Sequence, residues 1–521
     1  MRKERLPVVL LVLDGWGESL DKFGNAILQA YTPTIDYLTK SYFYTTLNAS
    51  GIAVGLPWEE PGNSEVGHST IGSGRVILQH FPRIIKAIQD RSFFSNKSFL
   101  KAMDHTRQNH STLHLVGLLG TGSVHSYIDH LYALLEMAEE NNVEQISLHL
   151  FTDGQDSPPQ EAAFLFRNLS ARLKTMSHVR ISTVVGRFYA MDRNHNWERT
   201  QKAYECMVNG NCPAISDIGA TLSEYYQQGL TDQTIPPFKV SAAGAEPLLI
   251  ASNDAIIFFD YREDRMRQIV ESFIFPAMAH FSPQPLDNMV YVTMTQYDEA
   301  YPVDVAFPPV PITNTLGEVL SREGLAQLRI AESEKYAHVT YFFNGGTEKP
   351  FPHESRVLIT SWRTTNLVEH PEMKAADITD RLVLELYKKS FDFAVVNFAN
   401  ADMLVHTGNF EATKKAVEII DQNIANIVKE VMNINGTVVI VGDHGKAERM
   451  INLRTNEVFT GHTTNPVPFL VIHRSLFREN PYDYVMEKNG RPDGILVDVA
   501  PTILNFLEIP QPAEMTGHSL L

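Results

Sequence analysis

The sequence predicts an α/β protein with two domains built around predominantly parallel sheets. Three observations lead to this prediction: short runs of Val, Ile and Leu recur along the chain, helical stretches separate them, and acidic residues follow several of the runs. Continuous apolar runs are typical of parallel strands that helices cover on both faces. The length of 521 residues exceeds what one hydrophobic core usually serves, so we expect more than one domain.

The expected strands share this continuous apolar pattern. In chain order they are 8–13, 145–151, 179–186, 255–260, 393–399 and 437–442. Segment 410–432 has the apolar spacing of a long amphipathic helix. The first run follows a basic start, as in a signal peptide, but it ends at Asp14 with no small-residue cleavage site, so we expect a buried strand. No stretch approaches the ~20 apolar residues that span a bilayer.

Composition narrows the class of protein. The chain is 44% hydrophobic and 20% charged, with a net charge of −17, which argues against general binding to nucleic acid or to an anionic membrane. Cys206 and Cys212 form no metal-type CxxC pattern and no disulfide framework. We therefore expect a reducing, cytoplasmic setting.

Acidic residues follow three of the expected strands. Asp14 follows the first run, Asp402 lies just after 393–399, and Asp443 with His444 ends 437–442. Ligands of open α/β sheets gather at the carboxyl ends of strands. A shared site would therefore bring the front and back of the chain into one domain, 1–76 with 311–521, and would make 77–310 an inserted domain.

These strand-end residues suggest a metal centre. Asp402 and His406 are four positions apart, which places both on one face of a helical turn. Each feature alone has a plainer explanation. Asp402 and His406 could form a capping or surface pair, and His462 could be a hydrogen-bonded histidine beside a turn. Together they give six oxygen and nitrogen ligands without a thiolate, which suits Mn²⁺ or Zn²⁺ better than Mg²⁺. The six are Asp14, Asp402, His406, Asp443, His444 and His462. Six ligands are too many for one open site and suit two ions.

The polar stretch PGNSEVGHSTIGSG, residues 61–74, contains the candidate nucleophile Ser64. A hydroxyl close to bound metal becomes a competent nucleophile. The surrounding glycines would let the backbone approach closely and offer amides to an oxyanion. The alternative is that the stretch is a surface turn in which Ser64 only caps a short helix.

Ordered motifs resemble those of cofactor-independent phosphoglycerate mutases. They include VVLLVLDGWG, PGNSEVGHSTIGSGR, GRFYAMDR, FFDYREDRMRQ, NFANADMLVHTG and GDHGKAERMIN, and they run from about residue 8 to the C-terminus. The resemblance implies an alkaline-phosphatase-like metal domain, split by an inserted phosphotransferase domain. It also implies interconversion of 3-phosphoglycerate and 2-phosphoglycerate. We expect a monomer, because each chain carries a whole expected site.

The resemblance assigns roles by motif. Asp402, His406 and His462 match the ligands of one ion, and Asp14, Ser64, Asp443 and His444 match those of the other. Ser64 matches the serine that carries the phosphoryl group. The implied cofactors are two Mn²⁺ ions, with Zn²⁺ or Co²⁺ as substitutes and without 2,3-bisphosphoglycerate.

The resemblance also assigns substrate-binding residues. They are His125, Gln155, Asp156, Arg187, Arg193, Arg262, Arg265 and Lys335. Arginine suits phosphate and carboxylate because its fork binds either group bidentately. Arg262 and Arg265 are three positions apart, which predicts that they share a helical face. The alternative for DYREDRMRQ is a solvated helix with surface ion pairs.

Several positions depart from the family's pattern. Gln155 stands where the family usually has a substrate-binding arginine, and 120–127 reads GTGSVHSY instead of SDGGVHSH. Val405 and Lys446 replace a common glycine and asparagine. Losing the arginine would weaken anion binding by roughly 1.5–3 kcal/mol if nothing compensates. These changes leave open two alternatives to the mutase: a phosphohydrolase in which water intercepts the phosphoserine, and a metal-stabilised binding protein without catalysis.

Overall fold

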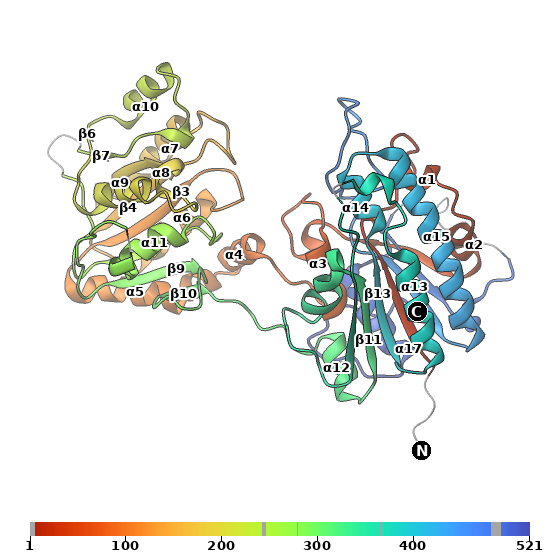
Figure 1. Ribbon diagram of the computed structural model, residues 1–521. Helices are drawn as coiled ribbons and strands as arrows, with labels where there is room; N and C mark the ends of the chain where they lie inside the picture. The colour runs from red at the N-terminus through yellow and green to blue at the C-terminus, as the bar shows by residue number, and fades with distance from the viewer. Residues whose placement is uncertain (1–5, 242–245, 279, 365, 481–490) are drawn as a thin grey trace. The chain divides into compact units, whose positions relative to one another are not determined.

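The structure is a computed structural model that describes residues 6–241, 246–278, 280–364, 366–480 and 491–521 (Figure 1). The chain forms two compact units: unit 1 combines Met1–Gln79 with Pro311–Leu521, and unit 2 is His80–Val310. The sequence-based boundaries lie after residues 76 and 310. Each unit is an α/β layer structure around its own eight-stranded sheet.

The unit 1 sheet has the order β12-β11-β13-β1-β14-β15-β2-β16. Its strands are β1 Val8–Leu13, β2 Phe43–Asn48, β11 Gln327–Glu332, β12 Glu354–Ile359, β13 Phe393–Phe398, β14 Thr437–Gly442, β15 Val467–Ile472 and β16 Gly494–Ile495. Neighbouring strands are parallel, except that β15 runs antiparallel to both β14 and β2. The central strand β1 is paired on both sides, with β13 and β14.

Both faces of the unit 1 sheet are covered. Alternate residues of β1 belong to different cores: Val9 and Leu11 pack on one face, and Leu10 and Val12 on the other. α13 and α15 cover the first face, and α12, α3 and α17 cover the second (Figure 1). The helices of this unit are α1 Ala26–Gln29, α2 Pro33–Ser41, α3 Ser64–Ser73, α12 Leu316–Arg322, α13 Ala375–Tyr387, α14 Asn400–His406, α15 Phe410–Asn433 and α17 Val499–Phe506.

The unit 2 sheet has the order β10-β9-β8-β3-β4-β5-β7-β6. Its strands are β3 Leu113–Leu119, β4 Ile146–Thr152, β5 Val179–Gly186, β6 Ala214–Ile215, β7 Phe238–Val240, β8 Ala255–Phe258, β9 Val290–Thr295 and β10 Asp304–Phe307. All pairs are parallel except β5 with β7. The β3 side chains again divide between two cores, Leu115 on one face and Val116 on the other.

Helices cover both faces of this second sheet as well. They are α4 His80–Gln89, α5 Lys97–Asn109, α6 Ile128–Glu140, α7 Ala162–Leu173, α8 Arg187–Ala190, α9 Trp197–Val208, α10 Ile218–Gln227 and α11 Arg267–Ile274. α5, α6 and α7 contribute to the core that contains Leu115, and α9 and α11 to the core that contains Val116. Across the residues placed in either unit, no helix is both long and apolar enough to cross a membrane.

The main secondary-structure predictions are confirmed. Each of the six expected strands is present, and the helix expected at 410–432 is α15. The continuous apolar runs lie in strands that are buried along most or all of their length, as expected for sheets covered on both faces. The antiparallel strands β7 and β15 are exceptions that the apolar runs did not reveal.

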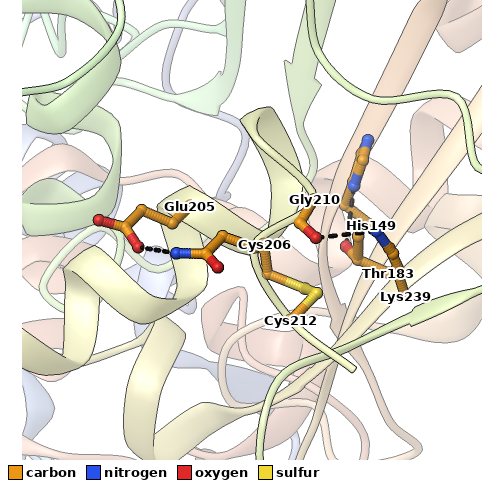
Figure 2. Close-up of a disulfide and its surroundings, with 8 residues drawn as sticks. His149, Thr183, Glu205, Cys206, Gly210, Cys212 and Lys239 are labelled. Carbon is orange, nitrogen blue, oxygen red and sulfur yellow. Dashed lines mark hydrogen bonds between the residues drawn. A yellow bond between two sulfur atoms is a disulfide. The ribbon is translucent and has the colours of Figure 1, made fainter. Parts of the chain in front are cut away.

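The prediction that the two cysteines form no disulfide is wrong. Cys206 of α9 and Cys212, just beyond it, are bonded, with their Cα atoms 5.2 Å apart (Figure 2). Gly210 lies between them with a φ of 63°, and its carbonyl accepts a hydrogen bond of 2.9 Å from Lys239 Nζ. This left-handed turn brings the chain back toward α9, and nothing in the cysteine spacing indicated it.

Asp260, which follows β8, is a buried carboxyl with a shifted pKa. Its Oδ1 accepts a hydrogen bond of 2.8 Å from the Leu118 amide, and its Oδ2 has no hydrogen-bond partner in the described part of the chain. Burial raises the pKa of Asp260 from 3.8 to about 7, against the opposing effects of Leu118 and Arg187. The folded protein therefore keeps this proton over a pH range in which the unfolded chain releases it.

Stability is therefore expected to fall as the pH rises from about 4 to about 7, because the unfolded state binds fewer protons in that window. Asp260→Asn imitates the protonated carboxyl. Between pH 5 and pH 8 the wild type should lose about 1–3 kcal/mol more unfolding free energy than Asp260→Asn. Urea unfolding of unit 2 at both pH values measures this difference. Asp287→Asn, at an exposed aspartate of the same unit, is the control and should follow the wild type. Equal pH dependence in Asp260→Asn and wild type would contradict the assignment.

Candidate metal centre

Three carboxylates meet at one edge of the unit 1 sheet. Asp14 follows β1, Asp402 lies in α14 after β13, and Asp443 follows β14. These strands are adjacent and parallel, in the order β13-β1-β14, so their carboxyl ends share one edge. Gly15 has a φ of 71°, and a Cβ there would lie 3.0 Å from the Asp402 backbone. The glycine after Asp14 thus allows α14 to approach the end of β1.

Ser64 is presented to this edge by a helix, not by a loop. α3 begins at Ser64, and its N-cap is Asn63, whose side chain accepts a hydrogen bond of 2.9 Å from the Val66 amide. The alternatives of a surface turn and of a capping Ser64 are therefore wrong. A Cβ on Gly67 would lie 2.6 Å from the Asp443 carbonyl. This glycine lets the helix approach protein backbone closely, as expected; that its neighbours offer amides to an oxyanion stays a prediction.

The first candidate ligand group consists of Asp14, Asp443 and His444, all buried, with donor atoms within 4.8 Å of one another. Ser64 Oγ donates to Asp14 Oδ1 at 3.0 Å and lies 3.0 Å from His444 Nε2. Asp443 Oδ1 accepts from the Gly15 and His444 amides, each at 3.0 Å. Asp443 Oδ2 is buried and has no hydrogen-bond partner among the residues that the structure places.

The second candidate group consists of Asp402, His406 and His462, again with donor atoms within 4.8 Å of one another. Asp402 Oδ2 lies 3.7 Å from His406 Nε2, and Asp402 Oδ1 lies 3.9 Å from His462 Nε2. His462 Nδ1 lies 2.7 Å from the Gly62 carbonyl, which orients Nε2 toward the carboxylate. The rings of His444 and His462 stack with centroids 4.2 Å apart, so the two groups adjoin.

Lys335 connects the two groups. Its Nζ lies 2.7 Å from each of three oxygens: Asp14 Oδ1, Asp402 Oδ2 and Ser64 Oγ. Burial alone would lower the pKa of Lys335, but the surrounding carboxylates raise it above its usual range. The side chain is therefore a permanent cation beside the serine hydroxyl. We expected Lys335 to bind substrate, and the structure places it beside the candidate ligands of the metal centre.

Asp14 and Asp402 are ionised. Burial raises the pKa of Asp14, but Lys335 and a hydrogen bond with His444 outweigh it and hold that pKa well below its usual range. Burial and the Asp14 charge raise the pKa of Asp402, but Lys335 and the other nearby cations lower it to about 2. Burial lowers the pKa of His444, yet Asp443 and Asp14 raise it to about 9. The centre thus combines ionised carboxylates with the positive charges of Lys335 and His444.

The histidines of the second group are neutral. Burial, followed by the charges of His444 and Lys446, lowers the pKa of His462 to about 4. Burial and Lys446 also lower the pKa of His406. A metal ion needs the imidazole in this neutral form with a free lone pair. Ionised Asp14 and Asp402, the neutral imidazoles of His406 and His462, and an Asp443 Oδ2 without a hydrogen bond in the described residues fit divalent cations, and the oxygen and nitrogen donors suit Mn²⁺ or Zn²⁺.

Two further residues hold this arrangement and were missed in the sequence. His68 Nδ1 lies 2.7 Å from the Ser64 carbonyl and 3.3 Å from Asp443 Oδ2. Asn397 of β13 donates to Asp14 Oδ2 at 2.8 Å and lies 3.0 Å from His68 Nε2. Their signals were present: His68 follows Ser64 by one helical turn, and Asn397 is the only polar residue of the run 393–399.

Unit 2 brings its predicted anion-binding residues to the ends of its own parallel strands. Arg187, directly after β5, is buried and donates to Asp153 and to Asp156 Oδ2, the latter at 2.6 Å. His125 Nε2 lies 3.6 Å from the same Asp156 oxygen. Burial and the charge of Arg187 lower the pKa of His125 to about 4. His125, Asp156 and Arg187 therefore form one linked cluster.

Two other predicted arginines share one acid. Asp264 binds Arg193 through Oδ2 and Arg262 Nε through Oδ1, the latter at 3.0 Å. Arg265 donates to the Met191 carbonyl at 3.3 Å. The prediction that Arg262 and Arg265 share a helical face is wrong, because α11 begins beyond them and both lie in the loop and turn before it. The chain leaves β8 through this loop, and the acids of DYREDRMRQ organise it.

Gln155, the departure from the family's arginine, is an exposed residue of the loop after β4. The backbone amide of Gln155 donates to Asp153 Oδ1 at 3.2 Å, and the Gln155 side chain is exposed. The surroundings therefore offer room for a longer side chain at this position.

The chain is similar to known proteins along almost its whole length. The sequence model of the family described as BPG-independent PGAM N-terminus matches residues 84–299. The 2,3-bisphosphoglycerate-independent phosphoglycerate mutase of Thermosynechococcus vestitus is 44% identical over 519 residues, which cover 99% of this chain and 95% of that protein. The corresponding protein of Clostridium botulinum (strain Langeland) is 42% identical over 516 residues, covering 99% of each. A crystal structure of Leishmania mexicana phosphoglycerate mutase at low cobalt concentration matches with a TM-score of 0.60 and 27% identity, covering 99% of this chain and 98% of that one.

Proposed function

The chain belongs to the 2,3-bisphosphoglycerate-independent phosphoglycerate mutase family and is an isomerase of that kind; from this premise we propose that it works through a phosphoserine at Ser64 beside two divalent ions. The proposed reaction interconverts 3-phosphoglycerate and 2-phosphoglycerate, a step of glycolysis and gluconeogenesis. The observation that carries the proposal is the position of Ser64 Oγ. It lies within 3.0 Å of Asp14 and His444 and 2.7 Å from Lys335 Nζ.

The two ligand groups would hold the two ions, preferably Mn²⁺. Asp14, Asp443 and His444 with Ser64 would hold one, and Asp402, His406 and His462 the other. When bound, such ions lower the pKa of a coordinated hydroxyl and neutralise phosphoryl oxygens. All seven ligands come from one chain, so the proposed site needs no second subunit and a monomer suffices.

The residues around Ser64 suit its role as a nucleophile. In the proposed step, Oγ forms a bond to the substrate phosphorus while the bond from phosphorus to the glycerate oxygen breaks. Asp14 Oδ1 already accepts the Ser64 proton in a hydrogen bond, and the departing glycerate oxygen gains one proton. The Lys335 ammonium lies 2.7 Å from Ser64 Oγ and stabilises negative charge on this serine oxygen. In a second transfer, the phosphoryl group passes from Ser64 to the other hydroxyl of the glycerate.

The arginines of unit 2 suit the anionic groups of a phosphoglycerate. Arg193 and Arg262 have about half of their side-chain surface exposed, 47% and 49%, and both hold the single acid Asp264. A phosphate or carboxylate can therefore bind these guanidinium groups from the solvent side. Arg187 is different: it is buried against two acids, so we assign it to positioning Asp156 and His125.

The test is a direct assay of the purified chain with Mn²⁺ and 3-phosphoglycerate, in which 2-phosphoglycerate and free phosphate are both measured. The mutase produces 2-phosphoglycerate with little free phosphate. Free phosphate as the main product would instead show a phosphohydrolase, in which water intercepts the phosphoserine. If neither 2-phosphoglycerate nor free phosphate forms, the chain would be a metal-binding protein without catalysis.

Gln155→Arg is expected to strengthen substrate binding. A new guanidinium at this exposed position adds a charge-assisted hydrogen bond to an anionic substrate, so KM for 3-phosphoglycerate should fall about tenfold. Because Gln155 lies outside the serine centre, kcat should change little. Steady-state kinetics measures both constants. Gln160→Arg makes the same charge change at an exposed residue of the same loop, and a similar fall in KM there would show that the effect is unspecific.

A further inference from the structure

Lys446 places a second ammonium group inside the metal centre. It follows Gly445 in the loop after β14, and its side chain is fully buried. Its Nζ lies 2.6 Å from Asp402 Oδ1 and 2.6 Å from His406 Nε2. Both atoms belong to the second ligand group, so the lysine already occupies donor atoms that a metal ion would use.

The two ligand groups differ in this respect. In the Asp402–His406–His462 group, Lys335 holds one Asp402 oxygen, and Lys446 holds the other together with His406 Nε2. In the Asp14–Asp443–His444 group, the ammonium of Lys335 contacts only Asp14 Oδ1. Asp443 Oδ2 in that group lacks a hydrogen-bond partner within the ranges that the structure describes, and its charged neighbours are imidazoles: His68 Nδ1 at 3.3 Å and His444 Nε2 at 3.8 Å. Lysine ammonium groups thus hold both carboxylate oxygens of the Asp402–His406–His462 group, but only one carboxylate oxygen of the other group among the described residues.

From this asymmetry we propose that Lys446 acts as an internal cation that weakens divalent-metal binding at the Asp402–His406–His462 group, so that the Asp14–Asp443–His444 group fills first. The inference rests on the proposed two-metal function and adds a specific order of binding to it. An ion can reach Asp402 Oδ1 and His406 Nε2 only if the ammonium leaves them. Two cations held close together in a buried site also repel each other strongly.

The experiment compares metal binding by the full-length wild type, Lys446→Met and Lys446→Asn, each stripped of metal with chelator and titrated calorimetrically with MnCl₂. Elemental analysis gives the number of ions bound. Lys446→Met keeps most of the side-chain volume, and Lys446→Asn introduces the residue common in the family. Lys415→Met is the matched control, since Lys415 is an exposed lysine of α15 in the same unit. His406→Ala removes a ligand of the second group and identifies its binding event.

The wild type should bind two ions whose dissociation constants differ by at least about tenfold, and His406→Ala should lose the weaker event. Both Lys446 variants should tighten that event by at least about tenfold and leave the tighter one unchanged. Lys415→Met should match the wild type. In thermal unfolding, Lys446→Met should be less stable than wild type in chelator, and saturating Mn²⁺ should remove the difference, because the ion then supplies the missing positive charge.

Two ions of equal affinity in the wild type would overturn the inference while leaving the proposed function intact. So would Lys446 variants with unchanged affinities. If Lys446→Met does not fold in chelator, the two dissociation constants of the wild type and those of Lys446→Asn still test the inference. A wild type that binds no ion at either group would instead contradict the two-metal function itself.

Discussion

Ser64→Ala is expected to abolish the mutase reaction, with kcat reduced by at least about 10⁴-fold. The hydroxyl oxygen contacts Asp14, His444 and Lys335 together, and the proposed intermediate is a covalent bond to that oxygen. Alanine fits the same space, so the fold should survive. The loss should appear in kcat because the variant has no acceptor for the phosphoryl group, whereas binding of phosphoglycerate depends on other residues.

The measurement combines kinetics with direct detection of the intermediate. Wild-type protein quenched during turnover should yield a phosphorylated peptide containing Ser64, and Ser64→Ala should yield none. Ser69→Ala, on the same helix and only partly buried, is the control and should retain activity and the phosphopeptide. Substantial turnover by Ser64→Ala would rule out the phosphoserine route.

Removal of divalent ions should have the second largest effect, lowering activity to below about 1% while the protein stays folded. Carboxylates packed this closely would normally repel one another once their cations leave. Here Lys335 contacts Asp14 and Asp402, and Lys446 contacts Asp402, so part of the negative charge stays balanced. The chelated protein should therefore keep its circular dichroism spectrum, with a Tm lowered by about 5 °C.

Activity should return on addition of Mn²⁺, and to a smaller extent with Mg²⁺, because imidazole ligands suit manganese better. The measurement is turnover of 3-phosphoglycerate before and after chelation, followed by titration with each ion. A protein that retains full turnover with no detectable metal would contradict the proposed role of the ligand groups. One that unfolds on chelation would contradict the charge balance attributed to the lysines.

Local sequence patterns predicted the elements of the site well. The runs 8–13, 393–399 and 437–442 became three adjacent parallel strands because predominantly apolar runs must be covered on both faces. Once those strands are adjacent and parallel, Asp14, Asp402 and Asp443 must lie at one edge. The two ligand groups that the motifs suggested are the groups whose donor atoms lie within 4.8 Å in the structure. The ions themselves and the phosphoserine stay predictions.

Other features could not be predicted because they depend on packing across the fold. The stretch 61–74 is rich in Gly and Ser and reads as a loop, yet α3 forms there because it packs against the Asp443 and Phe343 backbones, where only glycine fits. DYREDRMRQ has helical spacing, but Asp264 binds Arg193, far away in sequence, and the helix starts later. The disulfide depends on the left-handed turn at Gly210.

The sequence by itself determined the class of sheet, the identity of the candidate ligands and the serine beside them, because apolar runs and strand-end acids are local chemical signals. Only the tertiary structure decided which cations share the centre. Lys335 and Lys446 are distant from Asp402 in the chain, and their ammonium groups meet its carboxylate only after the strands have been brought together. Charge interactions depend on distance in space, and sequence separation does not report that distance.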